Sequence, residues 1–410
     1  MTNLEKLLNG IEVEWKPLGE VATIYGGLTG KSKGDFIDGN AFYISYKNIY
    51  DNIDVNCKKL EKVKVSDSER QNAVHYGDIL FTGSSETADD VGMSSVISEK
   101  FDKPVYLNSF SFGIRFNHNL KLIPEFSKYL FRCHFMRIAI AKTASGVTRY
   151  NVSKARFKKI LIPFPPISIQ KEIAGILDKF TMLEAELEAE LDCRKRQYEY
   201  YRNKLLSYDI LNCEGKLLNN VEVEWKTLGE ICEVLRGKRL TKRDLVDNAK
   251  YPIFHGGLEP IGYYNKNNRL ANSAMLINVG ASAGTVGFCN CDFWSSDGCF
   301  CFSHANILNQ RYLFYALQSI EPIIKSKVRK AGIPTLDNKY IERLSIPIPF
   351  PENQEKSLEI QLAIVSILDK FDKLTTSISE GLPAEIELRR KQYEYYRNKL
   401  LSFTNTKIAL

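Results

Sequence analysis

The stretch QYEYYRNKLLS occupies residues 197–207 and returns without one substitution at residues 392–402. Two further pairs of segments repeat: KLLNGIEVEWKPLGE at 6–20 with KLLNNVEVEWKTLGE at 216–230, and IQKEIAGILDKF at 169–180 with IQLAIVSILDKF at 360–371. Repeats of this length indicate a chain built from copies of one unit. The 410 residues therefore form two copies of one unit, alike at their ends and different in their middles.

Each copy divides into a variable block and a helical segment. The predicted division is a first block at 1–165, a first helix at 166–208, a second block at 209–351, a second helix at 352–404 and a tail at 405–410. Each block is long enough for a globular domain of its own. The start MTNLEKLLNG lacks the apolar run of a signal peptide, and no stretch approaches eighteen apolar residues, so we expect a soluble, cytoplasmic protein.

Apolar residues in each helical segment recur at steps of three and four, from Ile173 to Leu205 and from Ile364 to Leu400. This spacing predicts two coiled-coil seams, which could pair antiparallel, although each helix could instead lie on its own block. The second segment is four residues longer and contains Gly381 and Pro383, so we expect a kink or short break there. The predicted second seam runs through Ile378 and resumes at Ile386.

Both variable blocks are predicted to be mixed α/β with much strand. The apolar runs GDILFTG at 77–83 and NSAMLINVG at 272–280 each lead into a polar loop and a second apolar run, which is typical of strand, loop, strand. The expected architecture is two α+β domains separated by two long antiparallel helices, with a pseudo-two-fold internal repeat.

Positive charge gathers in the two blocks. Residues 1–165 hold 23 Lys and Arg against 18 Asp and Glu, and residues 216–351 hold 17 against 12, within a net charge of +7. A basic excess of this kind suits nucleic acid, although many solvated surfaces reach it.

Candidate nucleic-acid contacts fall in five segments. The loops SSETADD and ASAGT could read a groove or be plain turns, and the segments 144–157 and 330–344 each place Gly and then Thr among polar or basic residues. Arg and Asn make paired hydrogen bonds to guanine and adenine, whereas a basic cluster at 236–244 suits phosphates. The candidates are Ser84, Ser85, Thr87, Thr148, Arg149, Tyr150, Asn151, Arg236, Lys238, Arg239, Lys242, Arg243, Ser282, Thr285, Lys330 and Thr335.

Motifs for catalysis are not found. GGLTGKS at 26–32 departs from a phosphate-binding loop because Tyr25 stands where the first glycine belongs. Four cysteines at 289, 291, 299 and 301 could bind zinc, but their C-x-C spacing fits buried free thiols in a hairpin better. The five histidines are scattered, so we expect no catalytic residue, metal or cofactor on this chain.

Two variable domains, two repeated helices and no catalytic motif resemble the specificity subunit of type I restriction-modification enzymes. The resemblance is carried by the duplicated GDILF-type strand and loop, by the joint IPFPPISIQKEIAGIL at 162–177 with its partner SIPIPFPENQEKSLEIQLAIVSIL, and by the paired helices. It implies a noncatalytic subunit whose two target recognition domains each read one half of a split DNA site.

The resemblance also implies partners. Two methyltransferase subunits would bind the helices, and restriction and translocase subunits would join them. S-adenosylmethionine, ATP and Mg would bind to those partners and not to this chain. A partner that binds twice needs the same surface twice, so the repeated stretch supplies the candidates, although its tyrosines could simply complete the helix pair. They are Tyr198, Tyr201, Arg202, Lys204, Tyr393, Tyr396, Arg397 and Lys399. The alternatives are a single-chain DNA-modifying enzyme and a scaffold without a DNA role.

Overall fold

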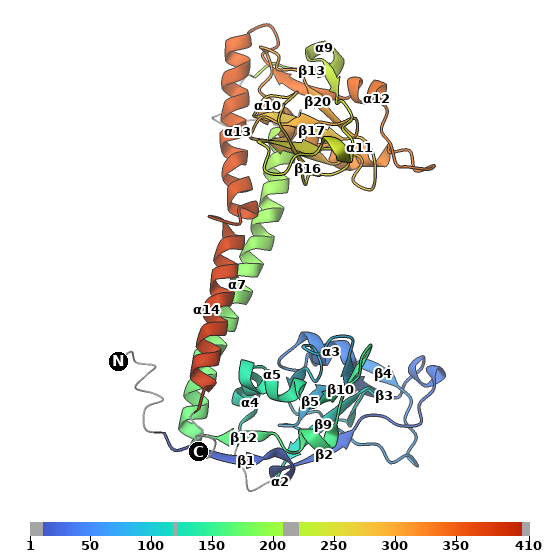
Figure 1. Ribbon diagram of the computed structural model, residues 1–410, viewed down its shortest axis with the longest axis vertical. Helices are drawn as coiled ribbons and strands as arrows, with labels where there is room; N and C mark the ends of the chain where they lie inside the picture. Colours follow the sequence, from blue (N-terminus) through green and yellow to red (C-terminus); the bar gives the residue numbers. More distant parts are fainter. Residues whose placement is uncertain (1–10, 118–121, 208–220, 404–410) are drawn as a thin grey trace. The chain divides into compact units, whose positions relative to one another are not determined.

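The chain forms two compact units in the computed structural model, which describes residues 11–117, 122–207 and 221–403 (Figure 1). The first unit comprises Met1–Glu186 and Ile386–Leu410, and the second comprises Leu187–Glu385. The predicted tail at 405–410 lies outside the described residues. Each unit holds one variable block and parts of both helical segments.

The first unit is built around a four-stranded sheet of order β2-β9-β5-β7. Its buried strand β5 is the predicted GDILFTG run. Three smaller sheets surround it, with orders β4-β3-β8, β10-β11-β6 and β1-β12. The strands are β1 (Glu14–Pro17), β2 (Ala22–Gly26), β3 (Ala41–Ile44), β4 (Glu61–Val63), β5 (Ile79–Thr82), β6 (Ser84–Ser85), β7 (Ser94–Val96), β8 (Val105–Leu107), β9 (Ser111–Phe116), β10 (Ala144–Ser145), β11 (Tyr150–Val152) and β12 (Leu161–Phe164).

The second unit repeats this plan. Its main sheet has the order β14-β20-β17-β18, with β17 as the predicted NSAMLIN strand, and its smaller sheets are β16-β15-β19 and β13-β21. The strands are β13 (Val223–Thr227), β14 (Val234–Arg236), β15 (Tyr251–Phe254), β16 (Gly262–Tyr264), β17 (Ser273–Ile277), β18 (Val286–Cys289), β19 (Trp294–Ser295), β20 (Cys299–Phe302) and β21 (Ser345–Pro349). The mixed α/β class and the internal repeat are thus confirmed.

Short helices complete each block, and α3 of the first unit has no counterpart among the described residues of the second. The first unit contains α2 (Leu18–Val21), η1 (Lys33–Phe36), α3 (Tyr46–Asp51), α4 (Pro124–Leu130), α5 (His134–Ala141) and α6 (Lys154–Phe157). The second contains α9 (Leu228–Ile231), η2 (Lys242–Asp244), α10 (Gln310–Ser319), α11 (Glu321–Ser326) and α12 (Asn338–Glu342).

The repeated ends of each block close it. The first lead-in forms β1, which lies beside the proline-rich joint β12 (Figure 1) and pairs with it antiparallel, with Trp15 opposite Pro163. In the second unit β13 pairs with β21, and Trp225 lies opposite Pro347. Proline is tolerated because these sheets have only two strands, so each strand has an edge that needs no hydrogen bond.

The long helices are α7 (Ile167–Leu205), α13 (Gln354–Thr376) and α14 (Leu382–Leu401). In the first unit Phe180 stacks on Tyr396 and Glu184 pairs with Arg390, so α7 and α14 run antiparallel there. The predicted break lies between α13 and α14. A Cβ on Gly381 would approach the Lys373 carbonyl oxygen to 2.6 Å, which explains the glycine at this turn.

Not all predicted seam residues are buried: Leu183 and Leu374 are 42% and 36% exposed, and the largest departure is at Ile378. Ile378 lies in the break rather than on a helix, and its side chain is 88% exposed. The apolar stripe resumes at Leu382 and Ile386, which are both buried. The spacing of apolar residues predicted a continuous seam, but α13 ends at Thr376, before Ile378.

Each block is fastened to its own helix by a repeated glutamine. The buried Gln170 accepts a hydrogen bond from the Ile123 backbone N–H at 2.9 Å and donates to the Pro165 carbonyl at 2.8 Å. The buried Gln361 accepts from the Asn309 N–H at 2.9 Å and donates to the Ile307 carbonyl at 2.8 Å. The same side chain therefore satisfies two backbone groups in each unit.

The cysteine cluster is not a hairpin. β18 and β20 both pair with β17, which lies between them, so the predicted pairing of the two C-x-C segments is wrong. Cys299 and Cys301 are buried free thiols, whereas Cys291 is exposed. Within the described ranges no group of three metal-ligating side chains comes together. None of the helices described here is long and apolar enough to cross a membrane.

Candidate nucleic-acid interface

A backbone junction in the first unit brings three distant segments together. Gly83, which follows β5, donates its N–H to the Phe110 carbonyl at 2.8 Å and accepts from the Val152 N–H at 3.0 Å. β6 then pairs with β11, placing Ser84 opposite Asn151. The loop after β5 and the β10-β11 hairpin therefore lie side by side.

A pocket of about 600 Å³ opens at this junction. Five predicted residues line it, which places two separate predicted segments at one site. They are Ser84, Ser85, Thr87, Thr148 and Arg149. The remaining lining residues were not among the single-residue candidates, although Glu86 and Asp90 belong to the predicted SSETADD loop. They are Tyr46, Tyr50, Glu86, Asp90 and Phe110.

The Arg149 guanidinium is held in place at the pocket. Its Nε and Nη2 donate to the buried Ser84 Oγ at 3.1 and 2.9 Å, and it lies 5.9 Å from the ring centroid of Phe110. Tyr46 donates its hydroxyl to the Ser84 carbonyl at 2.8 Å. Because Ser84 engages Nε and Nη2, the guanidinium presents a fixed edge to the pocket.

Acidic and hydroxyl groups also line this pocket. Thr87 donates to the Asp90 carboxylate at 2.6 Å, and desolvation together with Asp90 raises the pKa of Tyr50. The predicted Tyr150 and Asn151 belong to β11 but do not line the pocket. The site offers both donors and acceptors, which groove readout requires.

The same junction recurs in the second unit. Asn278, which follows β17, donates its N–H to the Gly298 carbonyl at 3.1 Å and accepts from the Leu336 N–H at 2.9 Å. A pocket of about 440 Å³ opens beside it. Three predicted residues line it, namely Arg236, Arg239 and Thr335.

The other groups in this pocket differ from those of the first unit. His255 Nδ1 lies 3.3 Å from the Asp297 carboxylate. The amide oxygens of Asn278 and Asn338 are buried without a hydrogen-bond partner among the described residues. A partial signal for Asn278 was its place at the end of the NSAMLIN run, but its partner Leu336 comes from a distant segment.

The remaining candidates of the second block lie outside the pocket. Ser282 and Thr285 form the turn between β17 and β18, where the Thr285 N–H donates to the Ser282 carbonyl at 3.0 Å. Lys238, Arg243 and Lys330 are exposed, and the side chain of Lys242 lies outside the described residues. The predicted basic cluster is therefore split between the pocket and the surrounding surface.

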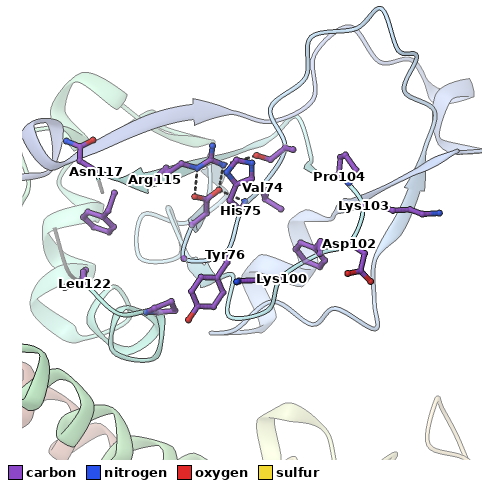
Figure 2. A pocket seen from close by; sticks show the side chains of 16 residues that line it. Val74, His75, Tyr76, Lys100, Asp102, Lys103, Pro104, Arg115, Asn117 and Leu122 are labelled. Carbon is purple, nitrogen blue, oxygen red and sulfur yellow. Dashed lines mark hydrogen bonds and ion pairs between the residues drawn. The ribbon is translucent and has the colours of Figure 1, made fainter. Parts of the chain in front are cut away.

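A larger hollow of about 750 Å³ in the first unit has another character. Figure 2 shows Tyr76, Lys100 and Lys103 around it and Arg115 at one end. Arg115 donates to both oxygens of the buried Asp78, at 2.8 and 2.6 Å, and Tyr25 donates to the same carboxylate at 2.6 Å. Hydrogen bonding to Asp78 raises the pKa of Arg115. Arg115 and Asp78 therefore neutralise each other, and their hydrogen bonds hold the loop before β5 against β9.

The repeated stretch QYEYYRNKLLS adopts the same arrangement in both units. Tyr198 is buried and donates to Gln318 at 2.7 Å, with Arg202 5.3 Å from its ring centroid, and Arg397 lies 5.2 Å from that of Tyr393. Four predicted partner residues therefore pack within the units, in agreement with the alternative that the tyrosines complete the helix pair.

The two tyrosines that prediction omitted are the most exposed tyrosines of the repeated stretch. Tyr200 and Tyr395 are 57% and 59% exposed, and Lys204 and Lys399 lie 5.4 and 5.8 Å from their ring centroids. Tyr201 is 43% exposed and Tyr396 is partly buried. Each of these two rings stacks on a phenylalanine of the other helical segment.

The type I restriction modification DNA specificity domain family matches residues 11–192 and 220–388, one match for each copy of the repeat. The chain belongs to this family. It is 33% identical to the EcoR124I/EcoR124II specificity subunit of Escherichia coli, over 98% of this chain and 97% of the relative. It is 31% identical to a putative type I specificity subunit of Haemophilus influenzae, over 98% and 99%.

Solved structures of the family share the fold. The S subunit of a type I restriction-modification system from M. genitalium superposes with a TM-score of 0.56 at 20% identity, over 99% of this chain and all of that one. A chain from a structure describing complex assembly of a type I system gives 0.67 at 16% identity, over 96% and 98%. These solved structures therefore confirm the fold with its duplicated domains.

Proposed function

We propose that this chain is the noncatalytic DNA-reading subunit of a type I restriction-modification complex and that it recognises a site of two unlike short words separated by unread base pairs. The observation that carries the proposal is the repeated junction with different side chains. Gly83 and Asn278 occupy equivalent places, yet Ser84 and Arg149 line one pocket whereas His255 and Asp297 line the other. Two domains of the same fold whose pockets are lined by different side chains suit the recognition of two different DNA sequences.

Each pocket suits base readout by its donors and acceptors. Arg149 presents guanidinium hydrogens, which pair with the guanine O6 and N7 acceptors, and Thr87 and Asp90 add acceptors beside it. In the second unit Arg236 and Arg239 bring guanidinium groups to the pocket, and Thr335 adds a hydroxyl group. Exposed Lys238, Arg243 and Lys330 suit phosphate contacts, which orient the protein on the duplex.

The partners follow from the family and the repeats. We propose that two methyltransferase subunits dock on the two copies of the repeated helix surface and that restriction and translocase subunits join them. S-adenosylmethionine, ATP and Mg would bind to those subunits, which would carry out methylation and cleavage. The complex would work in the cytoplasm, where bacterial DNA lies.

Methylation mapping tests the proposal. The chain is reconstituted with its methyltransferase, S-adenosylmethionine and genomic DNA, and modified bases are located by single-molecule sequencing. We expect two separated words. Arg149→Ala should relax only the first word and Arg236→Ala only the second, by about 10- to 100-fold in discrimination for a lost paired contact. Each variant is the control for the other, and one continuous word would contradict the proposal.

A further inference from the structure

The β10-β11 hairpin of the first unit ends in an exposed apolar side chain. Gly146 has a φ of +140°, and a Cβ there would lie 2.0 Å from the Arg149 carbonyl oxygen, so only glycine fits the turn. Val147, the next residue, is 89% exposed. The tip is fixed from one side because Arg149 is tethered to Ser84.

An equivalent hairpin stands in the second unit. Arg329 and Thr335 exchange backbone hydrogen bonds of 2.9 and 3.2 Å, and Gly332 between them has a φ of +81°. Ile333, the next residue, is 69% exposed. The Leu336 N–H donates to the Asn278 carbonyl, just as the Val152 N–H donates to the Gly83 carbonyl. The two hairpins therefore occupy the same place in the repeat.

A single exposed apolar residue needs no explanation, but this feature occurs twice. The two blocks differ in most other loop residues, and yet both keep a β-branched apolar side chain after a glycine with positive φ, beside the pocket. Cationic side chains accompany both tips, Arg149 in the first unit and Lys330 in the second. An apolar tip among cations suits an anionic surface that carries an apolar group.

Double-stranded DNA offers one such group in its major groove. Thymine alone among the four bases presents a methyl group there, and the groove is wide enough for a two-stranded ribbon. We propose that Val147 and Ile333 are specificity-determining residues that pack against the C5-methyl group of a thymine, Val147 in the first word and Ile333 in the second. This inference rests on the proposed function, since it requires each block to read its own word.

Replacement of thymine by deoxyuridine tests the contact, because it removes only the methyl group. Duplexes carrying the mapped site are prepared with each thymine of each word replaced in turn, and binding by the chain with its methyltransferase is measured. In each word one replacement should weaken binding about fourfold, the factor for burying one methyl-sized group. Val147→Ala should abolish the penalty in the first word only, and Ile333→Ala in the second only.

Exposed isoleucines elsewhere provide matched controls. Ile37 in the first unit and Ile323 in the second are exposed but lie outside the hairpins, so Ile37→Ala and Ile323→Ala should keep both deoxyuridine penalties. Melting of all four variants should match that of the unaltered chain, because none of these side chains is buried.

Three results would overturn the inference. They are a word without thymine on either strand, binding that is indifferent to deoxyuridine everywhere, and a penalty that persists in the alanine variants. If Val147→Ala weakens binding equally to thymine and deoxyuridine duplexes, the tip contacts DNA in another way. Failure of the proposed function is distinguishable, because the unaltered chain would then show no preference for the mapped site over a scrambled duplex.

Discussion

The ring of Phe180 stacks on the ring of Tyr396, with centroids 5.4 Å apart and planes 25° from parallel. In the second unit Tyr201 stacks on Phe371 with centroids 5.6 Å apart and planes at 26°. The repeated ILDKF segment of one helical segment thus meets the repeated QYEYY segment of the other, twice. The identity of the copies is explained in part by this reciprocal pairing, since a change in one repeat alters the partner of the other.

We expect Phe180→Ala and Phe371→Ala each to destabilise their unit by about 2 kcal/mol. Fully buried Phe→Ala changes cost about 3–5 kcal/mol, and these rings are only half-buried. Urea unfolding followed by circular dichroism measures the loss. Ile378→Asp is the control and should be neutral, because that side chain is exposed. Equal destabilisation by Ile378→Asp would mean that Ile378 is part of the interface.

The repeated glutamines give a second prediction. Gln361→Met keeps the size of the side chain but leaves the Asn309 N–H and the Ile307 carbonyl without their partner, which costs about 1–3 kcal/mol for each buried group. Gln170→Met should behave in the same way in the first unit. The exposed neighbour Leu362 is the control, and Leu362→Met should leave unfolding unchanged. Wild-type stability of both glutamine variants would refute the fastening role.

Partner binding should separate exposed from packed tyrosines. Combined Tyr200→Ala and Tyr395→Ala should lower methyltransferase capture by about 10-fold or more, as large exposed anchors do at interfaces, while melting stays the same. Tyr198→Phe should instead lower the melting temperature, because it removes the bond to Gln318 without changing the outer surface. Unchanged capture by the double variant would exclude these two tyrosines as docking anchors.

Alkaline pH should unfold the chain cooperatively. Burial raises the pKa of Tyr198 to about 12, and burial with hydrogen bonds to Asp178 and Asp369 raises the pKa values of Tyr129 and Tyr315 further. An unfolded tyrosine ionises near pH ~10, so the stabilisation is complete below that pH and is lost as pH rises toward 12. Each such tyrosine adds a slope of about 1.4 kcal/mol per pH unit.

Melting between pH 8 and 11.5, with tyrosinate absorbance recorded in parallel, measures this slope. Tyr198→Phe should lower the pH slope of stability by the contribution of one tyrosine, whatever its effect on stability at neutral pH. A melting temperature that stays constant above pH 10 would show that these hydroxyls ionise equally in both states.

Local patterns predicted the central strands because burial on both faces demands continuous apolar runs, which β5 and β17 show. The break before α14 was predictable because Gly381 and Pro383 disfavour helix. The exposure of Ile378 was not, since periodicity describes a helix only while the helix continues. Asn278 was missed for another reason, because its role depends on Leu336, and backbone contacts between distant segments leave no local signal. The cysteine strands were misassigned because alternation identifies strands but not which strand lies between them.

The reciprocal stacking means that half of this chain contains every residue type that the contact between the helices needs. The helix α7 alone carries both halves of the contact, Phe180 and Tyr201. A gene truncated after Ser207 would encode one reading domain with a helix able to pair with a second copy of itself, Phe180 of each meeting Tyr201 of the other. In the present chain both copies of the contact belong to one molecule, so one reading domain can diverge while the other stays unchanged.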